Sequence, residues 1–217
     1  MFLNREEAGV RLSVRLSREK FPKESIVVAI PRGGVVVGKS ISEVLRLPLK
    51  VLLVKKIGAS HNPELAIGAT GPPAGGDGIV FWDENLITDL KISNQEREKA
   101  LATTIHIIKS REEKLGLKIP DVRNKTIIVA DDGVATGATV IVASLILKKL
   151  GAKKIILATP VIAKSTQQQI AKYFDKIISV KTPLGFSAVG EFYREFPQVE
   201  DHEVKKLLIQ TKSGLTL

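Results

Sequence analysis

Residues 126–150 read TIIVADDGVATGATVIVASLILKKL, and the rest of the chain is best understood from this stretch. Its first five residues are apolar or β-branched, a pattern typical of a strand that is buried on both faces of a parallel sheet. From Val140 to Leu150 apolar residues recur as a broad helical stripe. The stretch therefore predicts a strand, a tight loop and a helix.

The loop between this strand and this helix has the composition of an anion-binding site. Gly133 and Gly137 allow φ > 0 and let the backbone approach a ligand closely. Thr136 and Thr139 add hydroxyl donors beside the free N–H groups at the start of the helix. Several such hydrogen bonds, at roughly 1.5–3 kcal/mol each, would hold a phosphate monoester.

Asp131 and Asp132 precede the loop, and two carboxylates would repel a lone phosphate. The pair is explained if something neutral or cationic lies between, and both sugar hydroxyls and a magnesium ion fit. These residues indicate a sugar phosphate. The loop lacks the lysine of a Walker A motif and does not match G-x-G-x-x-G. A plain βα turn with two acids at a helix start is the alternative, and it leaves the combination unexplained.

Ile127 to Thr139 resembles the phosphoribosyl-pyrophosphate signature of type I phosphoribosyltransferases. PRGG near residue 31 and PELAIGA near residue 63 resemble members whose acceptor is not established, and this wider resemblance covers nearly the whole chain. It implies that Asp131 and Asp132 hold the ribose hydroxyls, bind Mg²⁺ and are catalytic. The residues implied to bind the 5′-phosphate are Gly133, Val134, Ala135, Thr136, Gly137, Ala138 and Thr139.

The resemblance also implies an α/β fold with an open, mostly parallel sheet flanked by helices, and the hydrophobic pattern agrees. Further short apolar strands are predicted at 25–30, 49–54, 153–160 and 176–180. Helices are predicted near 35–45, 93–115, 164–173 and 201–210, the second of them opened by a capping box at Ser93 and Glu96. Such alternation favours parallel strands with right-handed crossovers.

Pro31 to Gly34, read PRGG, form a second glycine turn between a strand and a helix. Arg32 supplies a fixed cation with five donors, and the glycines expose backbone N–H groups, so the turn can bind a phosphate group. The resemblance assigns pyrophosphate binding to Arg32, Gly33 and Gly34, and a catalytic role to Arg32 on the leaving group. The alternative is a helix start with incidental glycines.

Lys55 and Lys56 follow the apolar run at 49–54 and are expected at the carboxyl end of a third strand. Three parallel strands would then present phosphate-binding groups at one edge of the sheet. The two lysines match in place a basic pair that adenine-type enzymes carry before a mobile loop, which implies substrate binding. An ordinary exposed lysine pair is the alternative.

Residues from about 58 to 82 contain turn signals and two short apolar runs, which predict a β-hairpin insertion. In related enzymes this insertion is a lid that closes over the sugar phosphate and excludes water. Glu64 is the candidate catalytic acid of the lid, since a carboxyl could manage a proton on the reacting nitrogen. The alternative is a salt-bridged surface glutamate.

The resemblance implies that the tail, about 181–217, forms a small hood that holds the acceptor, with or without a contribution from the N-terminus. Its aromatic residues either include a ring that stacks on a base or attach the terminal helix to the core. They are Phe186, Phe192, Tyr193 and Phe196.

The composition sets outer limits on the function. With 217 residues, 44% of them hydrophobic, the chain can bury one substantial core, and a single domain over 1–217 is expected. Cysteine is absent, so disulfides and thiol catalysis are excluded. Lys and Arg number 33 against 23 Asp and Glu, and this net charge of +10, spread along the chain, favours anionic ligands. No apolar stretch approaches the roughly 18–20 residues that span a bilayer, which predicts a cytoplasmic protein without membrane contact.

The expected reaction is transfer of phosphoribosyl from phosphoribosyl pyrophosphate to a nitrogen acceptor, a nucleobase or related compound, with release of pyrophosphate. Ala135 stands where hypoxanthine and guanine enzymes carry an aspartate, so that acceptor class is not expected. The alternative is a phosphoribosyl-pyrophosphate-sensing regulator that binds nucleic acid, although no helix-turn-helix or RNA-binding signature is present. A pyrophosphokinase would need an ATP site, and none is evident. Dimers are common in the family, so a homodimer is expected.

Overall fold

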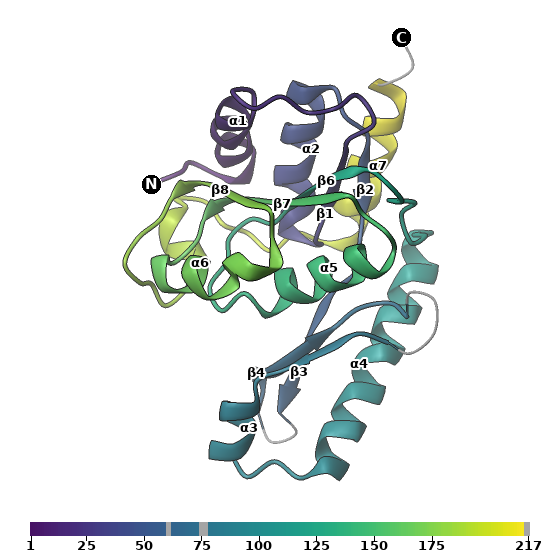
Figure 1. Cartoon of the computed structure of the whole chain (residues 1–217), viewed down its shortest axis with the longest axis vertical. Coiled ribbons are helices and arrows are strands. Elements are labelled where there is room, and N and C mark those ends of the chain that lie inside the picture. The colour runs from purple at the N-terminus through teal and green to yellow at the C-terminus, as the bar shows by residue number, and fades with distance from the viewer. Residues whose placement is uncertain (60–61, 74–77, 215–217) are drawn as a thin grey trace.

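The computed structural model describes residues 1–59, 62–73 and 78–214. Its centre is a sheet of five parallel strands in the order β2-β1-β6-β7-β8 (Figure 1). The strands are β1 (Ile26–Ala29), β2 (Leu49–Val51), β6 (Thr126–Ala130), β7 (Lys154–Val161) and β8 (Lys176–Lys181). The predicted open, parallel α/β architecture is confirmed.

Helices cover both faces of this sheet, because its strands direct successive side chains to opposite sides. Val27 and Ile128 belong to one buried apolar cluster, whereas Val28 and Val129 belong to another. The first face is covered by α1 (Arg5–Leu16), α2 (Gly33–Leu45) and α7 (Asp201–Gly214). The second is covered by α5 (Ala138–Lys149), α6 (Lys164–Ile170) and the 3-10 turn Ala171–Tyr173.

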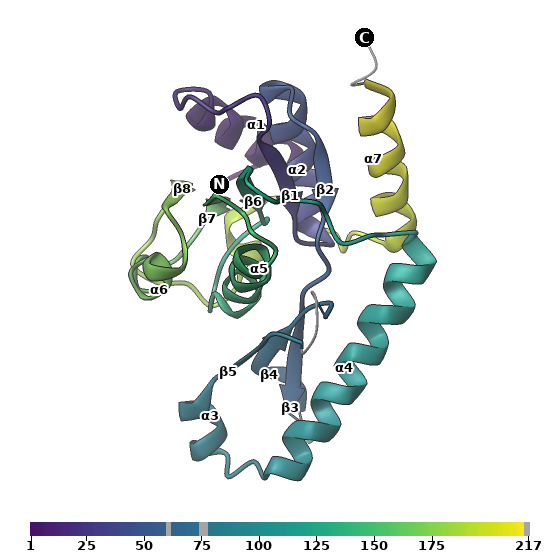
Figure 2. The same cartoon turned by 45° about the vertical axis from the view of Figure 1, so that its right-hand side comes forward.

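Residues 55–115 form an arm that extends away from the sheet (Figure 2). Its strands pair antiparallel in the order β3-β4-β5, and a small apolar core that includes Ile57, Ile67 and Ile87 stabilises it. The predicted hairpin is present as β4 and β5, and β3 adds a third strand. The elements of the arm are β3 (Lys55–Ala59), β4 (Asn62–Thr70), β5 (Val80–Trp82), α3 (Glu84–Asp89) and α4 (Asn94–Leu115).

The long helix α4 begins and ends where its sequence indicates. The Ser93 N–H donates to Glu96 Oε2 at 2.9 Å, and the Glu96 N–H donates to Ser93 Oγ at 3.3 Å, so the predicted capping box is confirmed. Gly116 follows the helix with φ of 63°, a conformation that favours glycine. The main helix of the arm thus has a defined cap at each end.

One predicted strand boundary is wrong, and it displaces two candidate residues. The run at 49–54 was expected as a single strand, but β2 ends at Val51. Leu52 to Val54 are apolar because they are buried in the connection between sheet and arm, and apolarity alone does not separate such a connection from a strand. Lys55 and Lys56 therefore begin the first strand of the arm instead of following a parallel strand.

The tail packs against the N-terminal segment of the chain. The Phe2 N–H donates to the Phe192 carbonyl at 2.7 Å, and the Arg194 N–H donates to the Phe2 carbonyl at 2.8 Å. The Tyr193 ring lies between Phe2 and Phe196, with ring centroids 5.3 and 4.8 Å away. The tail aromatics thus hold the N-terminal segment, whereas α7 packs on the sheet through residues such as Val204.

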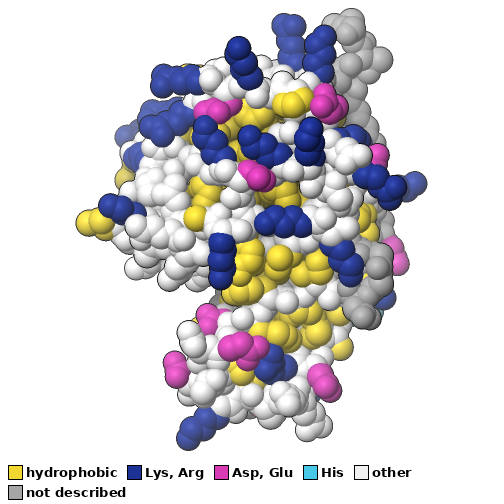
Figure 3. Space-filling model, viewed as in Figure 1, with side chains coloured by type: hydrophobic (Ala, Val, Ile, Leu, Met, Phe, Trp, Pro, Cys, Tyr) yellow, Lys and Arg dark blue, Asp and Glu magenta, His cyan; other side chains and the backbone are white. Residues whose placement is uncertain are grey.

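Basic side chains are scattered over the face of the molecule seen in Figure 3, with apolar side chains between them. This agrees with basic residues that are spread along the chain and form no single block. Among the helices that the structure describes, none is long and apolar enough to cross a bilayer.

Candidate functional site

The loop at 131–137 connects β6 to α5, and backbone contacts fix it in place. The Val134 N–H donates to the Val161 carbonyl at 2.9 Å, and the Ala135 carbonyl accepts from the Thr166 hydroxyl at 2.5 Å. Gly137 is the N-cap of α5 with φ of 85°. Within the described residues, no side chain caps this end of the helix and no acid lies in its first turn. The helix N-terminus is therefore suited to an anion.

Asp131 and Asp132 lie side by side at the carboxyl end of β6. Asp131 Oδ1 accepts from the Asp132 N–H at 2.9 Å. Burial raises the pKa of Asp131 well above its usual range, and the charge of Asp132 raises it further, while the charge of Lys56 acts in the opposite direction.

Asp132 is held by an arginine from the other end of the chain. Arg5 Nε donates to Asp132 Oδ2 at 2.6 Å, and the two side chains are only 9% and 17% exposed. The same guanidinium donates to the Pro197 carbonyl at 2.7 Å and lies 3.6 Å above the centroid of the Phe196 ring. These contacts fix both the arginine and the carboxylate that it holds.

Tyr193 makes a second contact with the acid pair. Its hydroxyl donates to the Asp132 carbonyl at 2.6 Å. Burial raises the pKa of Tyr193, and the charge of Asp132 adds to the effect, so the hydroxyl keeps its proton and acts as a donor. The tail is therefore hydrogen-bonded directly to the predicted sugar-binding residues.

Sequence reasoning missed Arg5. A weak signal was present, because Arg5 lies in the first turn of a helix, where the helix dipole favours acids. Despite this position it is buried. Tyr193 was among the tail aromatics expected either to stack on a base or to attach the terminal helix, and its contact with Asp132 was not foreseen.

The second glycine turn lies directly against the acid pair. Helix α2 begins at Gly33, earlier than the predicted start near residue 35, so both glycines lie in its first turn. A Cβ on Gly33 would lie 1.8 Å from Asp132 Oδ2, and one on Gly34 would lie 2.7 Å from the Ala130 carbonyl oxygen. The Pro31–Arg32 peptide bond before them is cis. Side chains are excluded here because the two turns nearly touch.

We expect Gly34→Ala to destabilise the protein by about 1–3 kcal/mol, because the new methyl group would meet backbone atoms that cannot rotate away. Gly185→Ala is the matched control, since a Cβ there meets nothing within 4 Å. Urea denaturation of both variants measures the difference. Equal free energies of unfolding would show that the turns are not packed as described.

The remaining candidate residues lie on the arm. Lys55 and Lys56 are exposed and, with Lys99 and Thr103 of α4, line a cavity of about 320 Å³. Glu64 lies in β4, but its side chain is outside the part of the chain that the structure describes. The structure thus brings the acid pair and the two glycine turns together, whereas Lys55 and Lys56 line a cavity on the arm. The expectation for Glu64 stays a prediction.

The comparison with known families gives these residues a context. A family model described as the phosphoribosyl transferase domain matches residues 3–191. The chain belongs to this family. The match includes both glycine turns and the acid pair, and it extends to the N-terminal arginine that holds Asp132. The phosphoribosyl transferase family predicted from the motif is therefore confirmed.

Individual relatives agree with this assignment to the phosphoribosyl transferases. A Mycobacterium tuberculosis H37Rv protein assigned provisionally as a phosphoribosyl transferase is 32% identical over 211 residues, 96% of this chain and 46% of that protein. The chain thus spans about half the length of the curated relatives it matches. A ribose-phosphate pyrophosphokinase from Pyrococcus furiosus is 32% identical over 98 residues, 40% of this chain and 35% of that protein.

Among solved structures, the crystal structure of TT1426 from Thermus thermophilus has a TM-score of 0.77 and 29% sequence identity. The similarity covers 96% of this chain and 98% of that one. The AQ2163 protein from Aquifex aeolicus has a TM-score of 0.52 at 13% identity, over 94% of this chain and 86% of that one, and shares the fold alone.

Proposed function

We propose that the chain transfers a phosphoribosyl group from phosphoribosyl pyrophosphate to a nitrogen acceptor and releases pyrophosphate. The observation that carries this proposal is the junction of two anion-binding turns on a carboxylate pair. The turns follow the neighbouring strands β1 and β6, and Gly33 lies so close to Asp132 that a side chain would not fit. A ligand with a phosphate at each end and a diol between matches this arrangement.

Each part of the site has a role in this proposal. Residues 133–139 hold the 5′-phosphate at the N-terminus of α5, and Asp131 and Asp132 accept hydrogen bonds from the ribose hydroxyls. Arg32, with the N–H groups of Gly33 and Gly34, stabilises the charge that collects on pyrophosphate as the bond to ribose breaks. Lys55 and Lys56, at the start of β3, are assigned to substrate binding from the arm. The similarity to a ribose-phosphate pyrophosphokinase supports a ribose phosphate as ligand.

Magnesium fits this site as an ion that arrives with the substrate. Among the described residues, no group of three or more His, Cys, Asp or Glu side chains could hold a metal. Mg²⁺ is commonly bound through one or two carboxylates together with substrate phosphates and water, and Asp131 and Asp132 supply such a pair. When bound, the ion would neutralise charge on the departing pyrophosphate.

The arm and the tail have supporting roles in the proposal, within a single domain. The insertion at 58–82 acts as the lid, with Glu64 on its central strand. Residues 181–217 and the N-terminal segment form the hood, which is supported by the pairing of Phe2 with the tail. Because Tyr193 and Arg5 both contact Asp132, movement of the hood would change the position of the carboxylate that is proposed to bind ribose.

The decisive experiment measures magnesium-dependent pyrophosphate release from phosphoribosyl pyrophosphate across a panel of nucleobases and small amines. Turnover with one class of acceptor is the expected result and would name the substrate. Ligand-induced thermal stabilisation without turnover on any acceptor, together with salt-dependent binding of DNA or RNA, would replace the enzyme by a regulator. If neither release nor stabilisation occurs, the sugar phosphate is not the ligand.

A further inference from the structure

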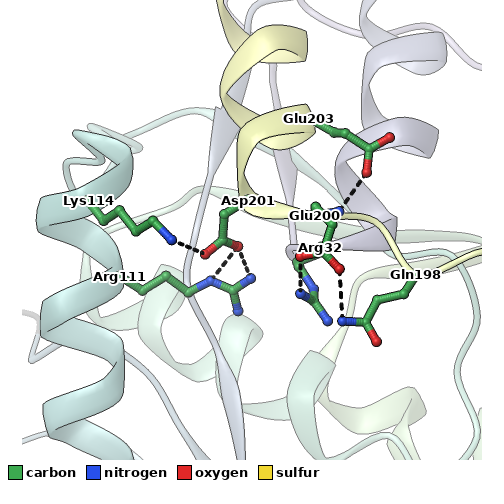
Figure 4. A network of polar contacts seen from close by, with 7 residues as sticks. All are labelled: Arg32, Arg111, Lys114, Gln198, Glu200, Asp201 and Glu203. Carbon is green, nitrogen blue, oxygen red and sulfur yellow. Dashed lines mark hydrogen bonds and ion pairs between the residues drawn. The ribbon is translucent and has the colours of Figure 1, made fainter.

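A cluster of cations lies apart from the acid pair, where α4 of the arm meets the first turn of α7 (Figure 4). A cavity of about 410 Å³ is present there, within the range of roughly 300–1,000 Å³ typical of small-ligand sites. Three of its lining side chains are cationic and come from two separate elements. The lining residues are Arg32, His106, Ile107, Ser110, Arg111, Lys114 and Asp201.

The cations of this cavity are paired with the protein's own carboxylates. Arg111 Nε donates to Asp201 Oδ1 at 2.9 Å, and its Nη2 contacts the same oxygen. Lys114 Nζ lies 3.8 Å from Asp201 Oδ2, and Arg32 Nη1 lies 3.5 Å from Glu200 Oε2. Two consecutive acids at the start of α7 thus face cations from the second glycine turn and from the arm.

These ion pairs are accessible and therefore exchangeable. Arg111 and Asp201 are 23% and 21% exposed, Arg32 is 29% exposed, and Lys114 and Glu200 lie more in solvent still. Hydrogen bonding from Arg111 lowers the pKa of Asp201, so this carboxylate stays ionised at neutral pH. The cavity already holds an anionic group, supplied by the chain itself.

We propose that this cavity binds a phosphate-class anion, which displaces Asp201 and Glu200 from Arg111 and Arg32. Two guanidinium groups present planar sets of donors that match phosphate oxygens, and Lys114 adds a point charge. The hydroxyl of Ser110 supplies a further donor. The inference rests on the proposed function only through Arg32, which belongs to the second glycine turn and is proposed to bind pyrophosphate. Its new content is that α4 of the arm supplies two of the three cations of the site.

Binding of inorganic pyrophosphate, measured by calorimetry on the whole chain, tests the proposal. Arg111→Gln is expected to weaken binding about tenfold, because it removes charge-assisted hydrogen bonds. Asp201→Asn is expected to strengthen binding, by about threefold or more, because it removes the competing carboxylate. Lys109→Gln, which removes the same charge from α4 outside the cavity, should leave affinity unchanged.

The opposite signs of the first two variants separate a ligand site from a structural salt bridge. If Asp201→Asn weakens pyrophosphate binding, or if Arg111→Gln and Lys109→Gln behave alike, the proposal is overturned. Should Arg111→Gln fail to fold, Lys114→Gln replaces it, since that side chain is 72% exposed and is expected to weaken binding about threefold.

Two sources of the anion are distinguished by repeating the titration with saturating phosphoribosyl pyrophosphate. Loss of the pyrophosphate signal identifies the site as the place of the leaving group, whereas an undiminished signal identifies a separate phosphorylated ligand. Failure of the proposed function would give a different set of binding results from failure of this inference. In that case Asp131→Asn and Asp132→Asn would not alter phosphoribosyl pyrophosphate binding, whereas the effects of Arg111→Gln and Asp201→Asn on inorganic pyrophosphate would persist.

Discussion

Asp131→Asn is expected to lower phosphoribosyl transfer by about 100-fold or more and to stabilise the protein when no ligand or metal is added. In the proposed reaction this carboxylate would hold the ribose diol and a magnesium ion, and Asn puts a neutral amide in its place. Loss of a single preorganised electrostatic contact commonly lowers rates by about 10²–10³-fold. Stability rises because Asn keeps the Oδ1 acceptor for the Asp132 N–H but removes one of two adjacent half-buried charges.

The stability gain of Asp131→Asn should depend on pH with a definite sign. The folded pKa of Asp131 is raised, so the folded state binds its proton more tightly than the unfolded state, whose pKa is about 3.9. The wild type is therefore penalised progressively as pH rises above about 4, until the folded pKa is passed. Thermal melts of both proteins between about pH 4 and pH 8 should diverge with rising pH. Curves that stay parallel would mean that Asp131 is not desolvated.

Arg5→Met is expected to lower the free energy of unfolding by about 2–4 kcal/mol, because it leaves the Asp132 carboxylate mostly buried without its cation. The methionine is similar in length and apolar, but it loses the guanidinium that lies over Phe196 and cannot donate to Asp132 or to the Pro197 carbonyl. Transfer activity should fall as well, since Asp132 loses the group that orients it. Urea denaturation and initial rates measure the two effects.

A control for Arg5→Met is available on the same helix. Arg11 pairs with Glu7 at the surface, with side chains 52% and 30% exposed, and Arg11→Met should change stability by less than about 1 kcal/mol. Asp132→Asn in the Arg5→Met background should recover part of the lost stability, because the unpaired charge is then gone. If Arg5→Met and Arg11→Met have equal free energies of unfolding, the Arg5–Asp132 pair contributes no more to stability than an exposed ion pair.

The parts of this molecule that were predictable are those encoded by contiguous residues. The strand at 126–130, the glycine loop and the capping box of α4 each depend on neighbours within about five positions, so periodicity and local chemistry define them. The placement of both glycine turns at one edge of the sheet also followed, because parallel strands end at the same edge. These inferences needed no knowledge of distant contacts. That the two turns touch at the acid pair is shown only by the structure.

The features that escaped prediction depend on the packing of distant segments. Arg5 and Asp132 are 127 positions apart, and the sequence around either residue does not indicate that the other is its partner. Lys55 was misplaced because a buried connection and a buried strand have the same apolar composition. The ion pair between Arg111 and Asp201 likewise could not be predicted from the sequence, since it forms only because the arm lies against α7.

The strand order has a consequence for how the polypeptide reaches this shape. β1 is paired on one side with β6, and the two meet through Ile26 and Ile127, about a hundred positions apart. During synthesis, one edge of β1 therefore stays unpaired until the arm and then β6 have been made. Contacts of such sequence separation slow folding, whereas the antiparallel arm, built from near neighbours, can form early.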